Sequence, residues 1–133
     1  MKASVLIIGL EPTLLDFSDP AYAAMPDMSA AKVLSALQAD AAHLNQLGYD
    51  AELCLTDLGE TAAAVVTDRL RGKRYDCILI GAGVRIHPKF FLLFEKLVNV
   101  VHEHAPQAKL CFNTRPSDTA EAVQRWCAPE RAR

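Results

Sequence analysis

Two arginines and several hydroxyl and amide side chains stand where they could bind an anion. Arg85 follows a glycine-rich turn after the apolar run Cys77–Ile80, and Arg115 follows a second apolar run that ends at Asn113. A guanidinium presents a planar fork of N–H donors that suits carboxylate or phosphate. If the two runs are neighbouring parallel strands, about 4.8 Å apart, both arginines reach one point above the sheet. We therefore expect a ligand-binding site for a small anionic or phosphorylated metabolite, formed by Glu11, Gly81, Gly83, Arg85, Asn113, Thr114, Arg115 and Ser117.

The same arginines have a second interpretation, in which they only hold loops together. Acidic side chains follow the predicted strands as well, and each arginine could form an ion pair with one of them. The acids concerned are Glu11, Asp16, Asp57 and Asp118.

Three side chains near the predicted strand ends could transfer protons. His87 follows the glycine-rich turn, Asp57 follows the second predicted strand, and Asp16 lies in the loop after the first. They are the candidate catalytic residues of an alternative function, a small hydrolase or transferase. No Ser-His-Asp arrangement is visible, and a lone histidine at a rim is more often polar surface. A third alternative is a non-enzymatic interaction module, which a filled crevice beside a large apolar patch would favour.

The sequence predicts neither a cofactor nor a metal ion. Gly81-Ala82-Gly83 matches part of a dinucleotide-binding motif, but it follows the third predicted strand, and the first strand has no GxGxxG after it. His102 and His104 are two residues apart, which is not the i, i+4 spacing of a helical metal pair.

Four cysteines are too widely spaced for a redox or zinc motif, and we expect reduced thiols in a cytoplasmic protein: Cys54, Cys77, Cys111 and Cys127.

Composition excludes two classes of partner. The net charge of −2 gives no basic face for nucleic acid. No apolar run approaches the roughly 20 residues that a membrane span needs. Three arginines near the end are expected to form a solvated tail, Arg125, Arg131 and Arg133.

Apolar runs and helical periodicity alternate along the whole chain. We expect strands at 3–10, 50–56, 77–80 and 108–113, and helices at 29–47, 60–71, 88–104 and from 118 onward. A helix between each pair of strands predicts a single α/β domain, residues 1–133, with a three-layer, doubly wound parallel sheet. The two most apolar strands belong at the centre, which gives the order 2-1-3-4 of a flavodoxin-like or Rossmann-like fold.

Two further segments have expected roles. The loop from Glu11 to Met28 contains three prolines and should pack over the strand ends through Phe17 or Tyr22. The helix at 88–104 is apolar around more of its circumference than one buried face requires. We therefore expect a homodimer that associates through this helix, with the last helix or the edge of the fourth strand as further contacts.

Two stretches resemble a known group of proteins. The segments GAGVR at 81–85 and FNTRPSDTAEAVQRW at 112–126 are similar to those of a group of small uncharacterised bacterial α/β proteins. The resemblance covers essentially the whole chain and implies a flavodoxin-like topology. It implies no activity.

Overall fold

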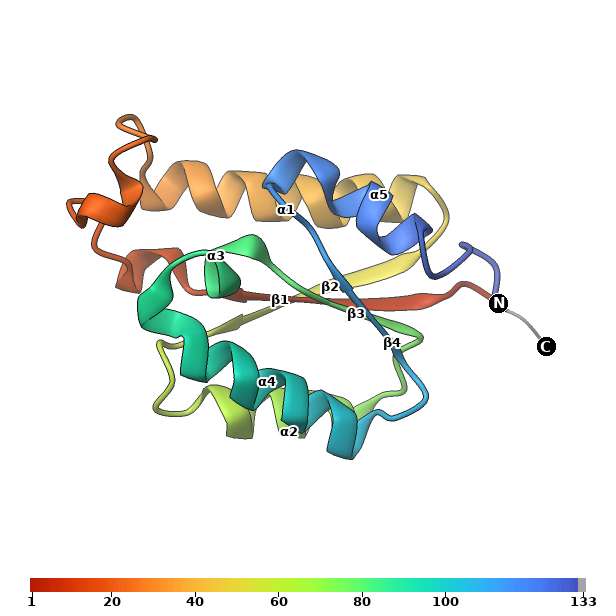
Figure 1. The fold of residues 1–133 in the computed structure, drawn as a ribbon. Coiled ribbons are helices and arrows are strands. Elements are labelled where there is room, and N and C mark those ends of the chain that lie inside the picture. The colour runs from red at the N-terminus through yellow and green to blue at the C-terminus, as the bar shows by residue number, and fades with distance from the viewer. Residues whose placement is uncertain (132–133) are drawn as a thin grey trace.

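The sheet has four strands, all parallel, in the order β2-β1-β3-β4. A computed structural model describes residues 1–131 (Figure 1). The strands are β1 (Ser4–Leu10), β2 (Asp50–Thr56), β3 (Cys77–Ile80) and β4 (Lys109–Phe112). The predicted strand order and the three-layer α/β class are confirmed. The order reverses between β1 and β3, as the two apolar central strands required.

Helices cover both faces of the sheet. α1 (Ala30–Gln46) and α5 (Thr119–Gln124) lie on one face, and α2 (Ala62–Gly72) and α4 (Phe91–His104) lie on the other (Figure 1). α1 begins where the Ser29 hydroxyl accepts a hydrogen bond from the Lys32 N–H. No helix of the described residues is both long and apolar enough to cross a membrane.

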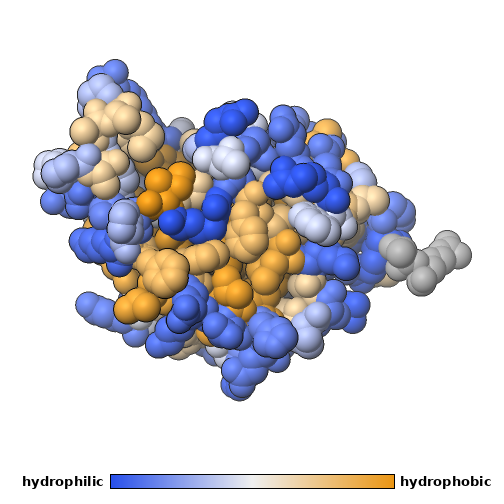
Figure 2. Space-filling model, in the orientation of Figure 1, coloured by the Kyte–Doolittle hydropathy of each residue, from blue (hydrophilic) through white to orange (hydrophobic). Residues whose placement is uncertain are grey.

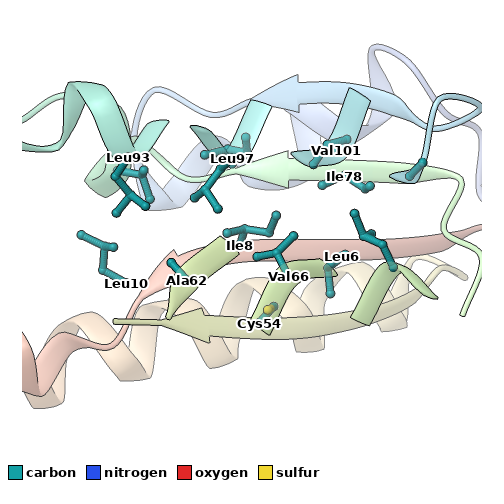
Figure 3. Packing of buried hydrophobic residues seen from close by; sticks show 14 of the residues in the cluster. Leu6, Ile8, Leu10, Cys54, Ala62, Val66, Ile78, Leu93, Leu97 and Val101 are labelled. Atoms are coloured by element: carbon teal, nitrogen blue, oxygen red, sulfur yellow. The ribbon is translucent and has the colours of Figure 1, made fainter. Parts of the chain in front are cut away.

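The central strand β1 explains why both layers are stable. Its side chains alternate between the two faces, and every residue of the strand is buried. Leu6 and Ile8 enter a cluster with α2 and α4, where Figure 3 shows them opposite Val66 and Leu97. Val5 and Ile7 enter the second cluster, with α1 and α5. Fully burying one such side chain contributes roughly 1.5–3 kcal/mol.

The glycine-rich turn after β3 is a single helical turn, α3 (Ala82–Arg85). The only glycines in the described residues with positive φ are Gly48 and Gly59, so this turn does not depend on left-handed backbone geometry. A Cβ added at Gly81 would lie 3.4 Å from the Ile8 carbonyl oxygen, so the turn passes close to β1. A further short 3-10 turn, Pro88–Phe90, precedes α4.

The last helix differs from its prediction. The capping-box spacing of Asp118 and Glu121 predicts a cap at its start, and its apolar stripe predicts that Trp126 faces inward. However, the Asp118 side chain makes no cap bond to α5 and Trp126 is 58% exposed. The helix ends at Gln124, so the chain turns away before Trp126 can reach the core. Ala122 and Val123 are the residues that the helix buries.

The chain after α5 is bound to the sheet. The Arg131 Nε donates to Asp76 Oδ2 at 2.9 Å, and the Arg125 Nη2 donates to the Phe112 carbonyl at 2.9 Å. The prediction of a solvated tail is therefore wrong for Arg131, whereas Arg125 stays exposed while it makes its bond, and Arg133 lies outside the described residues. All four cysteines are free, and three are buried, as predicted: Cys54, Cys77 and Cys111.

Candidate functional site

The Arg85 guanidinium is turned toward the sheet. Its Nε donates to the Ile80 carbonyl at 3.3 Å and its Nη2 donates to the Asn113 carbonyl. The guanidinium also lies over the Phe112 ring, 5.3 Å from its centroid. Burial lowers the pKa of Arg85, and Asp118 opposes this. Arg85 thus links the ends of β3 and β4, and its N–H groups are already partly used.

Arg115 lies on the outside of the same rim. Its side chain is 65% exposed, and its Nε donates to the Ser117 hydroxyl at 2.9 Å. A weaker contact joins its Nη1 to the Thr114 hydroxyl at 3.4 Å, and Asp118 lies 4.0 Å away. Arg85 and Arg115 therefore follow neighbouring strands, as predicted, but they share no hydrogen-bond partner.

Asn113 joins the strand ends through a buried chain of hydrogen bonds. Its Oδ1 accepts from the Ala82 N–H at 2.8 Å, and its Nδ2 donates to the Thr119 hydroxyl at 2.9 Å. The Thr119 hydroxyl in turn donates to Asp40 on α1 at 2.7 Å. Burial raises the pKa of Asp40, and the bond from Thr119 partly offsets this. The network ties α1, α3, β4 and α5 together without a ligand.

Asp40 is the member of this network that sequence reasoning missed. A signal was present, because Asp40 lies three residues after Leu37 and four before Leu44. It therefore falls on the apolar stripe of α1, where an unpaired carboxylate would be costly.

The other predicted ligand-binding residues have local roles. Glu11 accepts a hydrogen bond from the Thr13 hydroxyl at 3.0 Å. The Gly81 N–H donates to the Ile8 carbonyl, and Gly83 lies exposed on α3. In the described residues no buried side-chain nitrogen or oxygen lacks a hydrogen-bond partner. Each buried polar side chain at the strand ends of the described residues therefore already has a hydrogen-bond partner within the chain.

His87 holds the long loop against the start of α4. Its Nδ1 accepts from the Lys89 N–H at 3.1 Å, so the proton is on Nε2, which donates to Asp19 at 3.1 Å. The Tyr22 ring packs on His87 edge to face, with centroids 5.6 Å apart. The loop thus contacts this rim through Tyr22, one of its two predicted anchors. With both nitrogens engaged, His87 must break a bond before it can accept a proton.

Asp16 and Asp57 are local caps. Asp57 accepts from the Thr61 hydroxyl at 2.7 Å and from two backbone N–H groups before α2, and these bonds lower its pKa. Asp16 accepts from Ser18, which lowers its pKa in the same way. No hydrogen bond joins any two of His87, Asp16 and Asp57 within residues 1–131.

Two thiols lie in contact in the core. The Sγ atoms of Cys77 and Cys111 are 3.2 Å apart. That contact and burial raise the pKa of Cys77, and burial raises the pKa of Cys127 to about 12. A thiol attacks as its thiolate, so a raised pKa makes Cys77 and Cys127 weaker nucleophiles. No three His, Cys, Asp or Glu side chains in the described part of the chain are placed to hold a metal ion.

A hollow of about 520 Å³ lies at the opposite, amino-terminal edge of the sheet. Two of its cations are paired, since Lys73 contacts Asp50 at 2.8 Å and Arg131 contacts Asp76 at 2.9 Å. Lys2 and Arg74 also line the hollow and are exposed.

One exposed apolar area lies beside β4. We call it the α4–β4 surface and define it as Phe91, Phe94, Val98, Leu110 and Phe112. Phe91 is 57% exposed and the other four are half-buried. The Phe94 and Phe112 rings meet edge to face, 5.8 Å apart, so strand and helix share one patch. Figure 2 shows apolar residues gathered on the face that carries β4 and α4, with hydrophilic residues around them.

Comparison with known proteins gives no family. No protein-family model matches the chain, and no curated protein matches it in sequence.

A first prediction concerns Asp118, which holds the loop after β4. Its carboxylate accepts from the Thr114 N–H and hydroxyl and from the Arg115 N–H. An Asp118→Ala variant leaves these donors unpaired and should lose about 2 kcal/mol of unfolding free energy in urea titrations at pH 7.

The loss should depend on pH. Burial raises the pKa of Asp118, but the bonds from Thr114 and Arg115 outweigh burial and leave the pKa below 3.8. The carboxylate therefore stabilises the fold above that value and stops doing so as pH falls through its lowered pKa. The wild type and the Asp118→Ala variant should converge in stability in strong acid. A difference that is constant from pH 7 downward would contradict this role.

Proposed function

We propose that this protein is a non-enzymatic interaction module that self-associates as a homodimer through the α4–β4 surface. The observation that supports it most is a contrast between the carboxyl end of β4 and the outer edge of the same strand. The polar groups at its carboxyl end bond within the chain, whereas on its outer edge Arg125 covers only the Phe112 carbonyl and the adjacent apolar side chains stay partly exposed within residues 1–131. Exposed apolar patches of this kind commonly mark interaction sites.

The other edge of the sheet is covered at one residue. At the edge strand β2, the Asn45 side chain accepts from the Ala51 N–H at 2.9 Å and donates to the Ala51 carbonyl at 3.3 Å. Asn45 thus takes the place of a neighbouring strand at Ala51 and covers that part of the β2 edge. On β4 the outward-facing Leu110 has no such partner within the described residues.

A second copy of the chain suits the surface because the polar groups beside it are self-complementary, since a glutamate carboxylate accepts hydrogen bonds and a histidine ring N–H donates them. Glu95 and His102 are exposed on α4 and lie on the same side of the helix as Val98. The midpoint between positions 95 and 102 falls between Val98 and Asn99. Two antiparallel copies of α4, related by a twofold axis there, place Glu95 opposite His102 of the second copy.

Dilution followed by NMR tests the location of the contact. Amide resonances of β4 and of α4 from Phe91 to His102 should shift as the concentration is lowered, while those on the outer face of α2 stay constant. Concentration-dependent shifts confined to another face, or none up to high micromolar concentration, would reject the proposal.

Anion binding at the strand ends is the second candidate function, and Arg115 is the observation that favours it. The guanidinium is exposed, with the hydroxyls of Thr114 and Ser117 beside it. Inorganic phosphate should then raise the melting temperature of the wild type but not that of an Arg115→Ala variant. Equal responses of the two proteins would exclude this site.

A further inference from the structure

The outer edge of β4 carries an alternating set of backbone donors and acceptors. The Lys109 N–H donates to the Asp76 carbonyl of the neighbouring chain segment, so Lys109 and, by alternation, Cys111 face β3. Leu110 and Phe112 therefore turn their N–H and C=O groups outward. Among the described residues, only one of these groups has a partner, the Phe112 carbonyl, which accepts from Arg125.

We infer that two copies join their β4 strands in antiparallel register, so that one sheet runs through the dimer. This rests on the proposed self-association and specifies its geometry. A twofold axis at Cys111 places Leu110 opposite Phe112 of the second copy. These two residues then exchange both N–H···O bonds, and the symmetry repeats the pair. The spacing of the outward groups on a strand this short fits its own copy without a bulge.

The same axis also brings the apolar side chains of the two α4–β4 surfaces together. Rotation about an axis perpendicular to the sheet keeps each face on its own side, so α4 meets α4 of the second copy. The half-buried rings of Phe94 and Phe112 then lie near the axis and become covered. The ladder and the helix contact thus use one symmetry element, which is what a single closed dimer requires.

Arg125 competes with the second copy for this edge. Its guanidinium is bonded to the Phe112 carbonyl, which the second copy needs as an acceptor. Association must displace it. Positively charged side chains on edge strands commonly oppose unwanted pairing in this way. An Arg125→Ala variant should therefore associate several-fold more tightly than the wild type.

Amide hydrogen exchange read by NMR tests the ladder. With rising protein concentration, exchange at the Leu110 and Phe112 amides should slow in proportion to the dimer fraction. The outward-facing Leu53 amide of β2 is the matched control and should not change.

Two outcomes would overturn the ladder, and a third would overturn only the role given to Arg125. A dimer that leaves both β4 amides in fast exchange overturns the ladder but leaves self-association intact. Absence of any dimer overturns both. Weaker association of the Arg125→Ala variant overturns the role of Arg125 as a competitor for the edge.

Discussion

Replacing Val98 by lysine should raise the dimer dissociation constant by about 30-fold or more. Val98 is half-buried and lies next to the proposed twofold axis, so the two introduced charges would face each other across the interface. Central interface residues typically contribute about 2 kcal/mol or more, and 1.4 kcal/mol corresponds to a factor of ten. Sedimentation velocity over a concentration series measures the change.

The monomer should tolerate this substitution. Lysine has a higher helix propensity than valine, and its long stem can lie along the apolar surface with its charge in water. The matched control is Val65→Lys, because Val65 is a partly exposed valine on α2, away from the α4–β4 surface. Equal weakening of association in both variants would show that charge alone, and not the surface, controls self-association.

An Asn113→Ala variant should lose about 2–4 kcal/mol of unfolding free energy. Asn113 is 5% exposed, and its removal leaves the Ala82 N–H without its acceptor and Thr119 without its donor. Each buried group left unpaired costs about 1–3 kcal/mol. Urea titration at one fixed low protein concentration keeps dimerisation out of the comparison.

Asn99→Ala is the control for this experiment. Asn99 is an exposed asparagine on α4 whose side chain donates to the Glu95 carbonyl at 3.0 Å, and its loss should change stability by no more than about 0.5 kcal/mol. If Asn113→Ala costs as little as Asn99→Ala, the buried network does not hold the strand ends together. The polar groups there would then be free for a ligand.

The fold followed from the sequence because apolar runs and helical stripes are strong and repeated signals. Val5–Ile8 and Cys77–Ile80 are uninterrupted apolar segments, and such segments belong at the centre of a parallel sheet, where both faces are covered. The helices between them and the right-handed crossover rule left one order that satisfied both strands.

The site was harder to predict because side-chain direction depends on short turns. The sequence placed Arg85 and Arg115 after neighbouring strands, but not the one-turn helix that directs Arg85 back to the carbonyls of Ile80 and Asn113. Asp118 likewise bonds backward to Thr114, although its spacing to Glu121 favoured a cap on the last helix. In both cases a nearby backbone partner determined the outcome.

The mass of the protein in solution tests self-association most directly. Sedimentation equilibrium at neutral pH, from low to high micromolar concentration, should show the mass rising from the 14.5 kDa of one chain toward twice that value and then levelling off. A plateau at two chains is predicted because the twofold contact is closed and leaves no second copy of the surface free. A mass of one chain at every concentration would contradict the proposed self-association, and continued growth beyond two chains would contradict the closed twofold contact.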